Sequence, residues 1–133
     1  MILTSEQQDI RHIAAEISEK ILAPQAAYYD ETEEFPWENI RQLSQAGFMG
    51  MLVPEIYGGS ELNTVASMVA LEEISKACAA TGAIVAVHNA AGILPILNFG
   101  TDEQRKKYLP KLARGEMIGA FALTEPGAGS DAA

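Results

Sequence analysis

The sequence predicts a mainly α-helical fold: a bundle of helices that ends in a single short strand. Two capping boxes, at residues 4–7 and 101–104, mark helix starts, because in each a threonine hydroxyl and a glutamine amide satisfy free backbone groups. Between them apolar residues recur every three or four positions, which is the helical period. Only residues 117–123 are apolar, short and continuous, which favours a strand.

The first helix is expected to start at Thr4 and to carry an apolar stripe as far as Leu22. Pro24 is expected to kink or end it. Residues 28–34 are acidic and lack periodicity, so we expect a solvated connection there.

A second helix is predicted from 35–37, with Pro36 in its first turn and Gly47 as its C-terminal cap. Residues 49–53 are short and apolar. The proline and paired glycines of 54–59 then predict a turn or loop.

A third helix is expected to begin near Asn63. A fourth, from about residue 81 to 94, is apolar on nearly all sides, which predicts that other helices enclose it. Pro95 is expected to interrupt it and Gly100 to end the segment. The second capping box starts a last helix, which ends near Gly115.

Charge and cysteine content narrow the possible partners and compartment. Nine basic against eighteen acidic residues give a net charge of −9, which argues against nucleic acid and anionic membranes. The single cysteine, Cys78, cannot form an intrachain disulfide and is expected to be a buried packing residue in a reducing compartment. Residues 77–99 are the one candidate membrane span. They carry His88 and Asn89, which are costly in lipid, so we expect a core helix and no membrane insertion.

The expected strand implies more protein beyond it, because one strand cannot form a sheet alone. Residues 1–115 are therefore predicted to form an N-terminal helical domain. Residues 116–133 are predicted to be the truncated start of a middle β domain.

The segment after this strand carries the richest chemistry, at residues 124–131. Gly127 and Gly129 allow backbone N–H groups to approach a ligand, and Thr124 and Ser130 add hydroxyl donors. That inventory suits a phosphate or the edge of a flavin ring. A glycine-rich surface turn with no ligand is the alternative on spacing alone.

Several motifs, in order along the chain, resemble those of the acyl-CoA dehydrogenase family. Residues 121–131, FALTEPGAGSD, are very similar to its flavin-loop signature. Residues 54–59 resemble its P-x-x-Y-G-G turn, and residues 71–74 its L-E-E-[IL] helix. The run that begins at residue 95 and ends at residue 110 resembles P-I-x-x-x-G…Q…[YW]-L-P.

The resemblance implies a subunit of three parts, with FAD between the middle and C-terminal domains and assembly as a homotetramer. It implies oxidation of acyl-CoA thioesters to trans-2-enoyl-CoA, by α-proton abstraction and β-hydride transfer to flavin. An electron-transferring flavoprotein is the expected electron acceptor. The expected location is the bacterial cytoplasm, or the mitochondrial matrix in a eukaryote.

The resemblance also assigns residues. The FAD-binding stretch would be Phe121, Ala122, Leu123, Thr124, Glu125, Pro126, Gly127, Ala128, Gly129 and Ser130. Leu123 and Thr124 would lie near the isoalloxazine, Gly129 and Ser130 near the pyrophosphate, and Ser130 would also touch the substrate. Glu125 is expected to shape the turn. No catalytic residue is expected here, because the family's glutamate base lies in the missing C-terminal domain, so this chain alone is predicted to be inactive.

His88 has two interpretations. A histidine on an apolar helix is usually a satisfied core or interface residue. In the family this helix borders the acyl-chain cavity, so His88 could instead bind substrate by setting the depth of that cavity. No metal site is predicted.

Two rival functions remain at this stage. An acyl-CoA oxidase or nitroalkane-oxidase relative would share the fold and pass electrons to oxygen. A stand-alone helical interaction module would use the glycine loop for nothing, but a lone strand near the end of the chain weighs against it.

Overall fold

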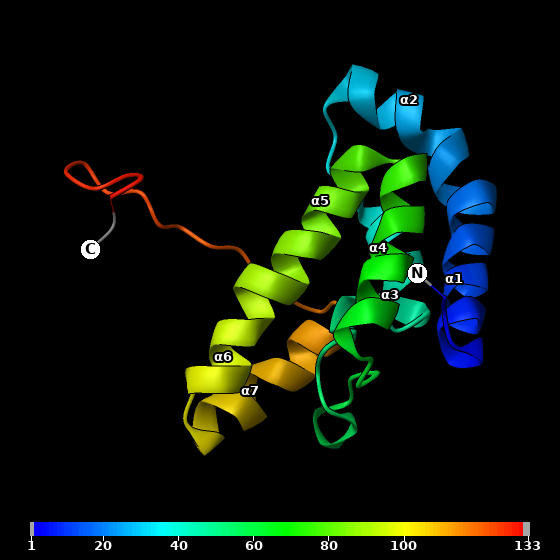
Figure 1. The fold of residues 1–133 in the computed structure, drawn as a ribbon. Helices are drawn as coiled ribbons and strands as arrows, with labels where there is room; N and C mark the ends of the chain where they lie inside the picture. The colour runs from blue at the N-terminus through cyan, green and yellow to red at the C-terminus, as the bar shows by residue number, and fades with distance from the viewer. Residues whose placement is uncertain (1, 132–133) are drawn as a thin grey trace.

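The computed structural model describes residues 2–131, and this part of the chain is built from helices without a strand (Figure 1). Two π-helical turns, η1 and η4, interrupt runs of α-helix, and η4 lies in the longest apolar run. Two short 3₁₀ helices, η2 and η3, lie between α3 and α4. In chain order the elements are α1 (Ser5–Ile17), η1 (Ser18–Leu22), α2 (Ala23–Thr32), α3 (Trp37–Gln45), η2 (Phe48–Gly50), η3 (Glu55–Tyr57), α4 (Thr64–Ala77), α5 (Ala79–Val87), η4 (His88–Ile93), α6 (Leu94–Phe99) and α7 (Asp102–Ala113).

The first helical run is longer than the sequence predicts. The capping box at Thr4 is confirmed, since its hydroxyl accepts from the Gln7 N–H at 3.3 Å. The kink expected at Pro24 is also confirmed: the π-turn η1 precedes it, and Figure 1 shows α2 turned away from the axis of α1. The solvated connection expected at 28–34 is wrong, because α2 continues to Thr32. Its side chains are largely exposed, so they carry no apolar stripe that would reveal a helix.

The connections after α3 and α7 follow the predicted glycine chemistry. Gly47 takes up the left-handed conformation just after α3, with φ 82°, and Gly115 does so after α7, with φ 66°. L-residues with a side chain rarely adopt that conformation, which is why glycine ends both helices. The turn expected at 54–59 is present and contains the short η3 helix.

Pro95 does not interrupt the fourth helical run as predicted. The run continues from α5 through η4 into α6 and ends at Gly100, and Pro95 occupies the first turn of α6. The π-turn η4 ahead of Pro95 explains this difference, because its wider spacing accommodates a residue that has no N–H to donate. Pro24 follows η1 in the same way, so both π-turns are followed by a proline at the second position.

The run Ala79–Phe99 is long and apolar enough to cross a membrane by length and composition, and 39% of its most apolar window is buried. Its buried side packs against α4, η2 and α7, as a core helix should. The expectation that other helices enclose it on all sides is met only in part.

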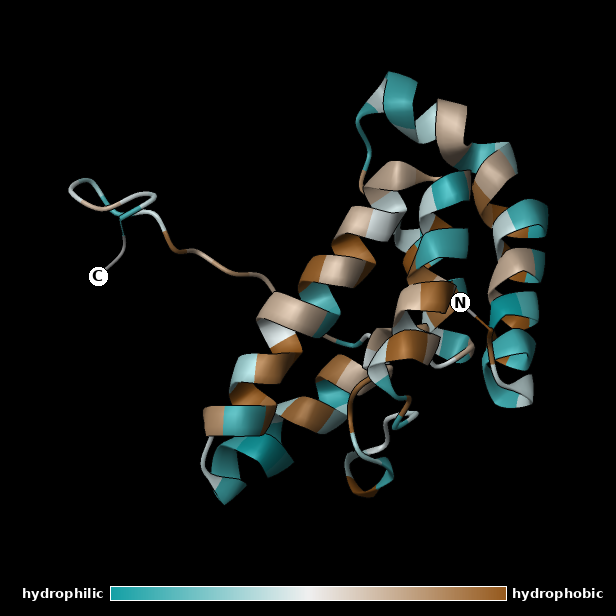
Figure 2. Ribbon diagram, in the orientation of Figure 1, coloured by the Kyte–Doolittle hydropathy of each residue, from teal (hydrophilic) through white to brown (hydrophobic). Residues whose placement is uncertain are grey.

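Two groups of buried apolar side chains hold the helices together. The larger joins α1, α3, α4 and α5 and includes Leu22, Leu43, Phe48 and Ile74. The smaller joins α6 and α7 to the segment after η2, through Val53, Ile93, Leu109, Leu112 and Ala113. Hydrophilic residues lie on the outward side of α1 and around α7 (Figure 2).

The strand expected at 117–123 is wrong for the described part of the chain. These residues have no strand hydrogen bonds and run out from the helices as a single chain (Figure 1). A strand requires a neighbour to accept and donate its ladder bonds, and no such neighbour is present among residues 2–131. The mainly α-helical class itself is confirmed.

Candidate functional site

The glycine-rich loop lies at the far end of the single chain that leaves the helices (Figure 1). Its centre is a tight turn: the Glu125 N–H donates to the Ala128 carbonyl at 2.8 Å, and the Ala128 N–H donates back at 3.1 Å. Pro126 and Gly127 occupy the two central positions. The backbone of Glu125 therefore closes this turn, while its side chain is exposed to solvent.

Open space surrounds both loop glycines. A Cβ atom placed on Gly127 or Gly129 would meet no other atom within 4 Å. Neither glycine has a positive φ, since in residues 2–131 glycines with positive φ occur only at Gly47, Gly58 and Gly115. Any requirement for glycine at position 129 therefore comes from what approaches it, not from local backbone strain.

The loop makes no hydrogen bond to the helices within the described residues. The backbone donors of Leu123, Thr124, Gly129 and Ser130 have no acceptor among them. Unused N–H groups beside side-chain-free positions fit a phosphate or a polar ring edge. The residues present therefore fit one edge of an FAD site, and which of them bind FAD stays a prediction.

The last hydrogen bond from this chain to the helices is made by Gly119. Its N–H donates to Nδ1 of His88 at 2.8 Å, and Nε2 of His88 lies 3.1 Å from the carbonyl oxygen of Leu112. Since Nδ1 accepts, Nε2 must carry the proton and donate to that carbonyl. The ring is thus a neutral bridge between the last turn of α7 and the departing chain.

Burial keeps the bridging ring uncharged. The His88 side chain is completely buried. Burial lowers the pKa of His88 because the charged imidazolium would lose its hydration, and interactions with the backbone of Leu112 and Met49 oppose this only in part. The core interpretation of His88 is therefore what the structure shows, whereas its effect on acyl-chain length stays a prediction.

The crossing at Gly119 is a direct backbone contact. A Cβ on Gly92 would lie 2.7 Å from the Cα of Gly119, and a Cβ on Gly119 would lie 2.9 Å from the Cα of Gly92. Neither position has room for a side chain unless the two segments separate. Sequence reasoning missed this contact, although a glycine inside an apolar, strand-like run is a signal of close backbone approach.

Asn89 follows His88 in the same π-turn and bonds to a different neighbour. Its side-chain amide donates to the carbonyls of Phe48 at 3.0 Å and Val85 at 3.1 Å, and its oxygen accepts from the Met51 N–H at 3.1 Å. The π-turn thus presents two buried polar side chains, one to the η2 segment and one to the departing chain. Sequence reasoning noted both residues but not this division.

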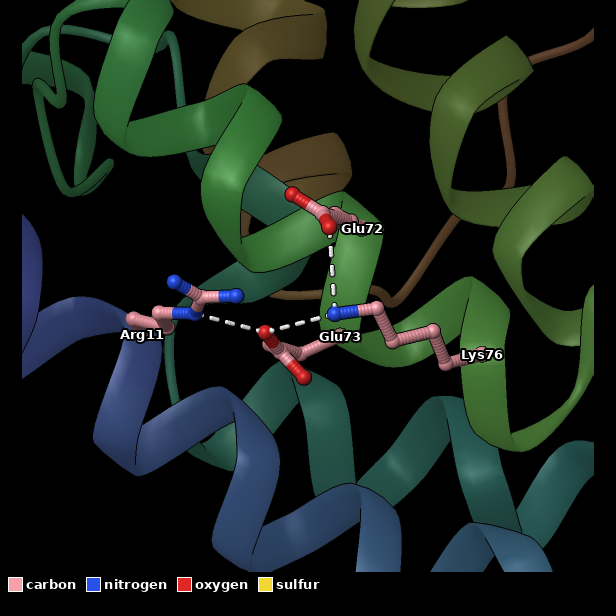
Figure 3. A network of polar contacts seen from close by, with 4 residues as sticks. All are labelled: Arg11, Glu72, Glu73 and Lys76. Atoms are coloured by element: carbon pink, nitrogen blue, oxygen red, sulfur yellow. Dashed lines mark hydrogen bonds and ion pairs between the residues drawn. The ribbon is translucent and has the colours of Figure 1, made fainter. Parts of the chain in front are cut away.

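Two further polar contacts of the described residues lie within the helical body. Residues 2–131 hold no group of three metal-binding side chains. Cys78 is buried, as expected, and its sulfur accepts a hydrogen bond from the Thr81 hydroxyl at 3.2 Å. Figure 3 shows Glu73 of α4 between Arg11 of α1, at 2.7 Å, and Lys76, at 3.1 Å. This network joins α1 and α4 at the surface and includes neither His88 nor a loop residue.

Comparison with known proteins places these features in a family. Residues 4–116 match the family model described as "Acyl-CoA dehydrogenase, N-terminal domain". The chain belongs to the acyl-CoA dehydrogenase family. The resemblance seen in the sequence motifs is thereby confirmed.

Relatives in this family match almost the whole chain. An acyl-CoA dehydrogenase of Bacillus subtilis is 46% identical over 132 residues, which are 99% of this chain and 35% of that protein. A short-chain-specific acyl-CoA dehydrogenase of Clostridium acetobutylicum is 44% identical over 129 residues, 97% of this chain and 34% of its own length. The chain thus spans about a third of the length of these acyl-CoA dehydrogenases.

Solved acyl-CoA dehydrogenases share the fold. The butyryl-CoA dehydrogenase of Megasphaera elsdenii superposes with a TM-score of 0.91 at 36% identity, over 99% of this chain and 35% of that one. An acyl-CoA dehydrogenase from Bacillus anthracis, solved with FAD, gives a TM-score of 0.90 at 39% identity, over 98% of this chain and 22% of that one.

Proposed function

We propose that this chain supplies the N-terminal helical domain, residues 1–115, and the first flavin-binding loop of an FAD-dependent acyl-CoA dehydrogenase that acts on short acyl chains. Family membership carries the proposal. Its short-chain part is supported by the names of two relatives, the short-chain-specific enzyme of Clostridium acetobutylicum and the butyryl-CoA dehydrogenase of Megasphaera elsdenii. The proposed reaction converts the acyl-CoA thioester to the trans-2-enoyl-CoA.

The loop would hold one edge of FAD. Leu123 and Thr124 would face the isoalloxazine, and Gly129 and Ser130 the pyrophosphate, with Ser130 also reaching the CoA thioester. When bound, FAD supplies the acceptor for the hydride that leaves the β-carbon. The exposed donors and the open space at Gly127 and Gly129 support this assignment.

The base that removes the α-proton would come from outside this chain. Glu125 is a carboxylate within the expected flavin-binding stretch, but its backbone forms the turn and its side chain is exposed. A general base needs a fixed position against the substrate α-carbon, and nothing in the described residues fixes this carboxylate. We therefore assign Glu125 to turn formation and expect residues 1–133 alone to be inactive.

The whole protein would assemble as a homotetramer and pass its electrons to an electron-transferring flavoprotein. A structure described as the electron transferring flavoprotein of Acidaminococcus fermentans contains a chain that matches this one with a TM-score of 0.93 at 42% identity. Relatives are both bacterial and mitochondrial. The bacterial cytoplasm or the mitochondrial matrix is the corresponding location.

One relative supports a second candidate in the opposite chemical direction. A 3-(aryl)acrylate reductase of Clostridium sporogenes is 42% identical over 132 residues, and these cover 35% of its length. A reductase would hydrogenate an α,β-unsaturated acid derivative where a dehydrogenase forms one. An oxidase relative would share the oxidation and differ in its electron acceptor. Family membership argues against the stand-alone interaction module.

Anaerobic titration of the complete protein separates these functions. Butyryl-CoA should bleach the flavin absorbance of the wild-type protein, and electron-transferring flavoprotein should restore it. Recovery with oxygen alone at a comparable rate would identify an oxidase instead. Bleaching by a strong reductant followed by recovery with an arylacrylate, with no response to butyryl-CoA, would identify the reductase.

Two loop variants of the complete protein test the loop assignment. Gly129→Val should lose FAD, because a branched side chain would fill the approach to the ligand. Ser130→Ala should be milder, since it deletes one hydroxyl contact of about 0.5–1.5 kcal/mol. A yellow, fully loaded Gly129→Val beside a colourless Ser130→Ala would contradict the assignment.

A further inference from the structure

We propose that His88 is a positioning residue that fixes the point at which the chain leaves the helical domain, and thereby sets where the flavin loop lies. The inference rests on the proposed function, because it concerns how the loop meets FAD. It gives His88 a role different from that of an acyl-cavity residue.

The bond between Gly119 and His88, here called the anchor, lies close to the loop along the chain. Gly119, whose N–H is held by His88 at 2.8 Å, precedes the first loop residue, Phe121, by two positions. An extended residue spans at most about 3.6 Å, so the start of the loop lies within about 7 Å of the held residue. Residues 120–127 are exposed and add no further hydrogen bond to the helices within the described part. The position of Gly119 therefore dictates where the loop begins.

The His88 ring bonds to two segments of the chain. Nε2–H of His88 donates to Leu112 in the last turn of α7, and Nδ1 receives the Gly119 N–H. One side chain thus spans the turn that runs from α7 to the departing chain. The imidazole ring is completely buried and Gly119 is half-buried, which limits competition by water for these bonds.

Packing limits movement at the same point. The backbones of Gly92 and Gly119 touch, and Ile118 packs against the larger core group. These contacts restrain the segment sideways, whereas the bond to Nδ1 restrains the Gly119 peptide plane. That plane sets the direction in which the following residues leave.

Asn89 provides the matched control. It is the next residue of the same π-turn, is also buried and bonds to Phe48 and Met51 instead of the departing chain. Replacing it should destabilise the helices without disturbing Gly119. Any effect that appears for His88 variants and not for an Asn89 variant then belongs to the anchor.

Conservative variants of His88 separate its two bonds. The side-chain oxygen of Asn lies as many bonds from Cβ as Nδ1 does, so His88→Asn can keep the Gly119 bond and loses the Leu112 bond. The amide nitrogen of Gln lies as far along as Nε2, so His88→Gln does the reverse. His88→Leu keeps the bulk and loses both.

The experiment uses the complete protein and measures the Kd for FAD, the visible flavin spectrum and the Tm of the FAD-free form. His88→Gln and His88→Leu should bind FAD about tenfold more weakly, as expected for one lost hydrogen bond near the upper end of the usual range, with a shifted flavin spectrum. His88→Asn should stay within about threefold of wild type. Asn89→Leu should lower Tm and leave both flavin measurements unchanged.

Two results would overturn the inference. Equal weakening of FAD binding by Asn89→Leu and His88→Leu would show a general stability effect, and stronger FAD binding by His88→Gln than by His88→Asn would show that the wrong bond had been chosen. If His88→Leu fails to fold, the order of the Asn and Gln variants still decides. A wild-type protein that binds no FAD would refute the proposed function itself.

Discussion

The helical body and the chain that leaves it obey different physics. In the body, residues such as Phe48 and Leu43 are almost completely buried, and two capping boxes and three glycine turns satisfy or redirect the backbone. Between Gly119 and Asp131 the side chains are largely exposed, and the only backbone pairing in that stretch is the small turn at Glu125 and Ala128. Contacts among its own residues stabilise the helical body. The loop lacks such contacts within the described residues, so we expect its conformation to depend on a binding partner.

This difference explains why the π-turn η4 matters. It lies where the two regions meet, and its consecutive residues His88 and Asn89 point to different partners. A π-turn breaks the regular helical rotation and often marks a functional position. Here it allows consecutive side chains of one helical run to bond to the core at Phe48 and to the departing chain at Gly119.

The largest expected contrast comes from the same substitution in the two regions. Phe48→Ala should destabilise residues 1–133 by about 3–5 kcal/mol, because it leaves a cavity in the core. Phe121→Ala should change stability by less than about 0.5 kcal/mol, since its side chain is 58% exposed. Urea denaturation followed by helical circular dichroism measures both, and equal losses would show that the loop packs on the body.

A buried polar side chain should give the next largest effect. Asn89→Ala leaves the Met51 N–H and the Phe48 carbonyl without their partner, which should cost about 2–3 kcal/mol. Asn98→Ala, on the exposed side of α6, is the control and should be nearly neutral. A small effect at Asn89 would mean that water replaces its bonds readily.

The bridging histidine should make stability depend on pH. Folding lowers the pKa of His88, so the neutral ring contributes its full share of the free energy of unfolding above the ordinary pKa near 6.5. This contribution declines as the pH falls from 6.5 toward the lower pKa of the folded state. One proton sets the limit of the slope at about 1.4 kcal/mol per pH unit. His88→Asn should flatten the slope in this window, whereas His12, which is exposed, provides a control in His12→Asn.

The surface network in Figure 3 should give the smallest effect. Burial alone would raise the pKa of Glu73, but hydrogen bonds from Arg11 and Lys76 outweigh it and the pKa is lowered. The ionised Glu73 therefore stabilises the folded protein above its ordinary pKa near 4.5. This stabilisation is lost as the pH falls through the lower pKa of the folded state. Glu73→Gln should weaken the protein slightly at neutral pH and less at high salt. An effect as large as that of Asn89→Ala would show that this pair does more than join two helix surfaces.

Local signals predicted most of the body. The capping threonines, the glycines at 47 and 115 and the apolar stripes depend on neighbours within one or two turns, so the sequence displays them directly. The errors lie where distant contacts decide: α2 has no buried side to reveal it, and Pro95 continues a helix only because η4 precedes it.

The site could be predicted less completely. The flavin loop is visible as a motif, but the contact of Gly92 with Gly119 joins residues far apart in sequence. The expected strand at 117–123 failed because its apolar pattern anticipates a partner that residues 2–131 do not contain. An apolar pattern therefore predicts a strand only together with the segment that pairs with it.

Amide hydrogen exchange of residues 1–133 tests the division between the two regions most directly. The Gly119 amide is half-buried and donates to Nδ1 of His88, so it should exchange far more slowly than the loop amides, though faster than the core of α5. The amides of Leu123, Thr124, Gly129 and Ser130 should exchange at the rate of unstructured peptide. Rapid exchange at Gly119, or strong protection throughout 121–124, would contradict the claim that Gly119 is the last residue held by the helical body.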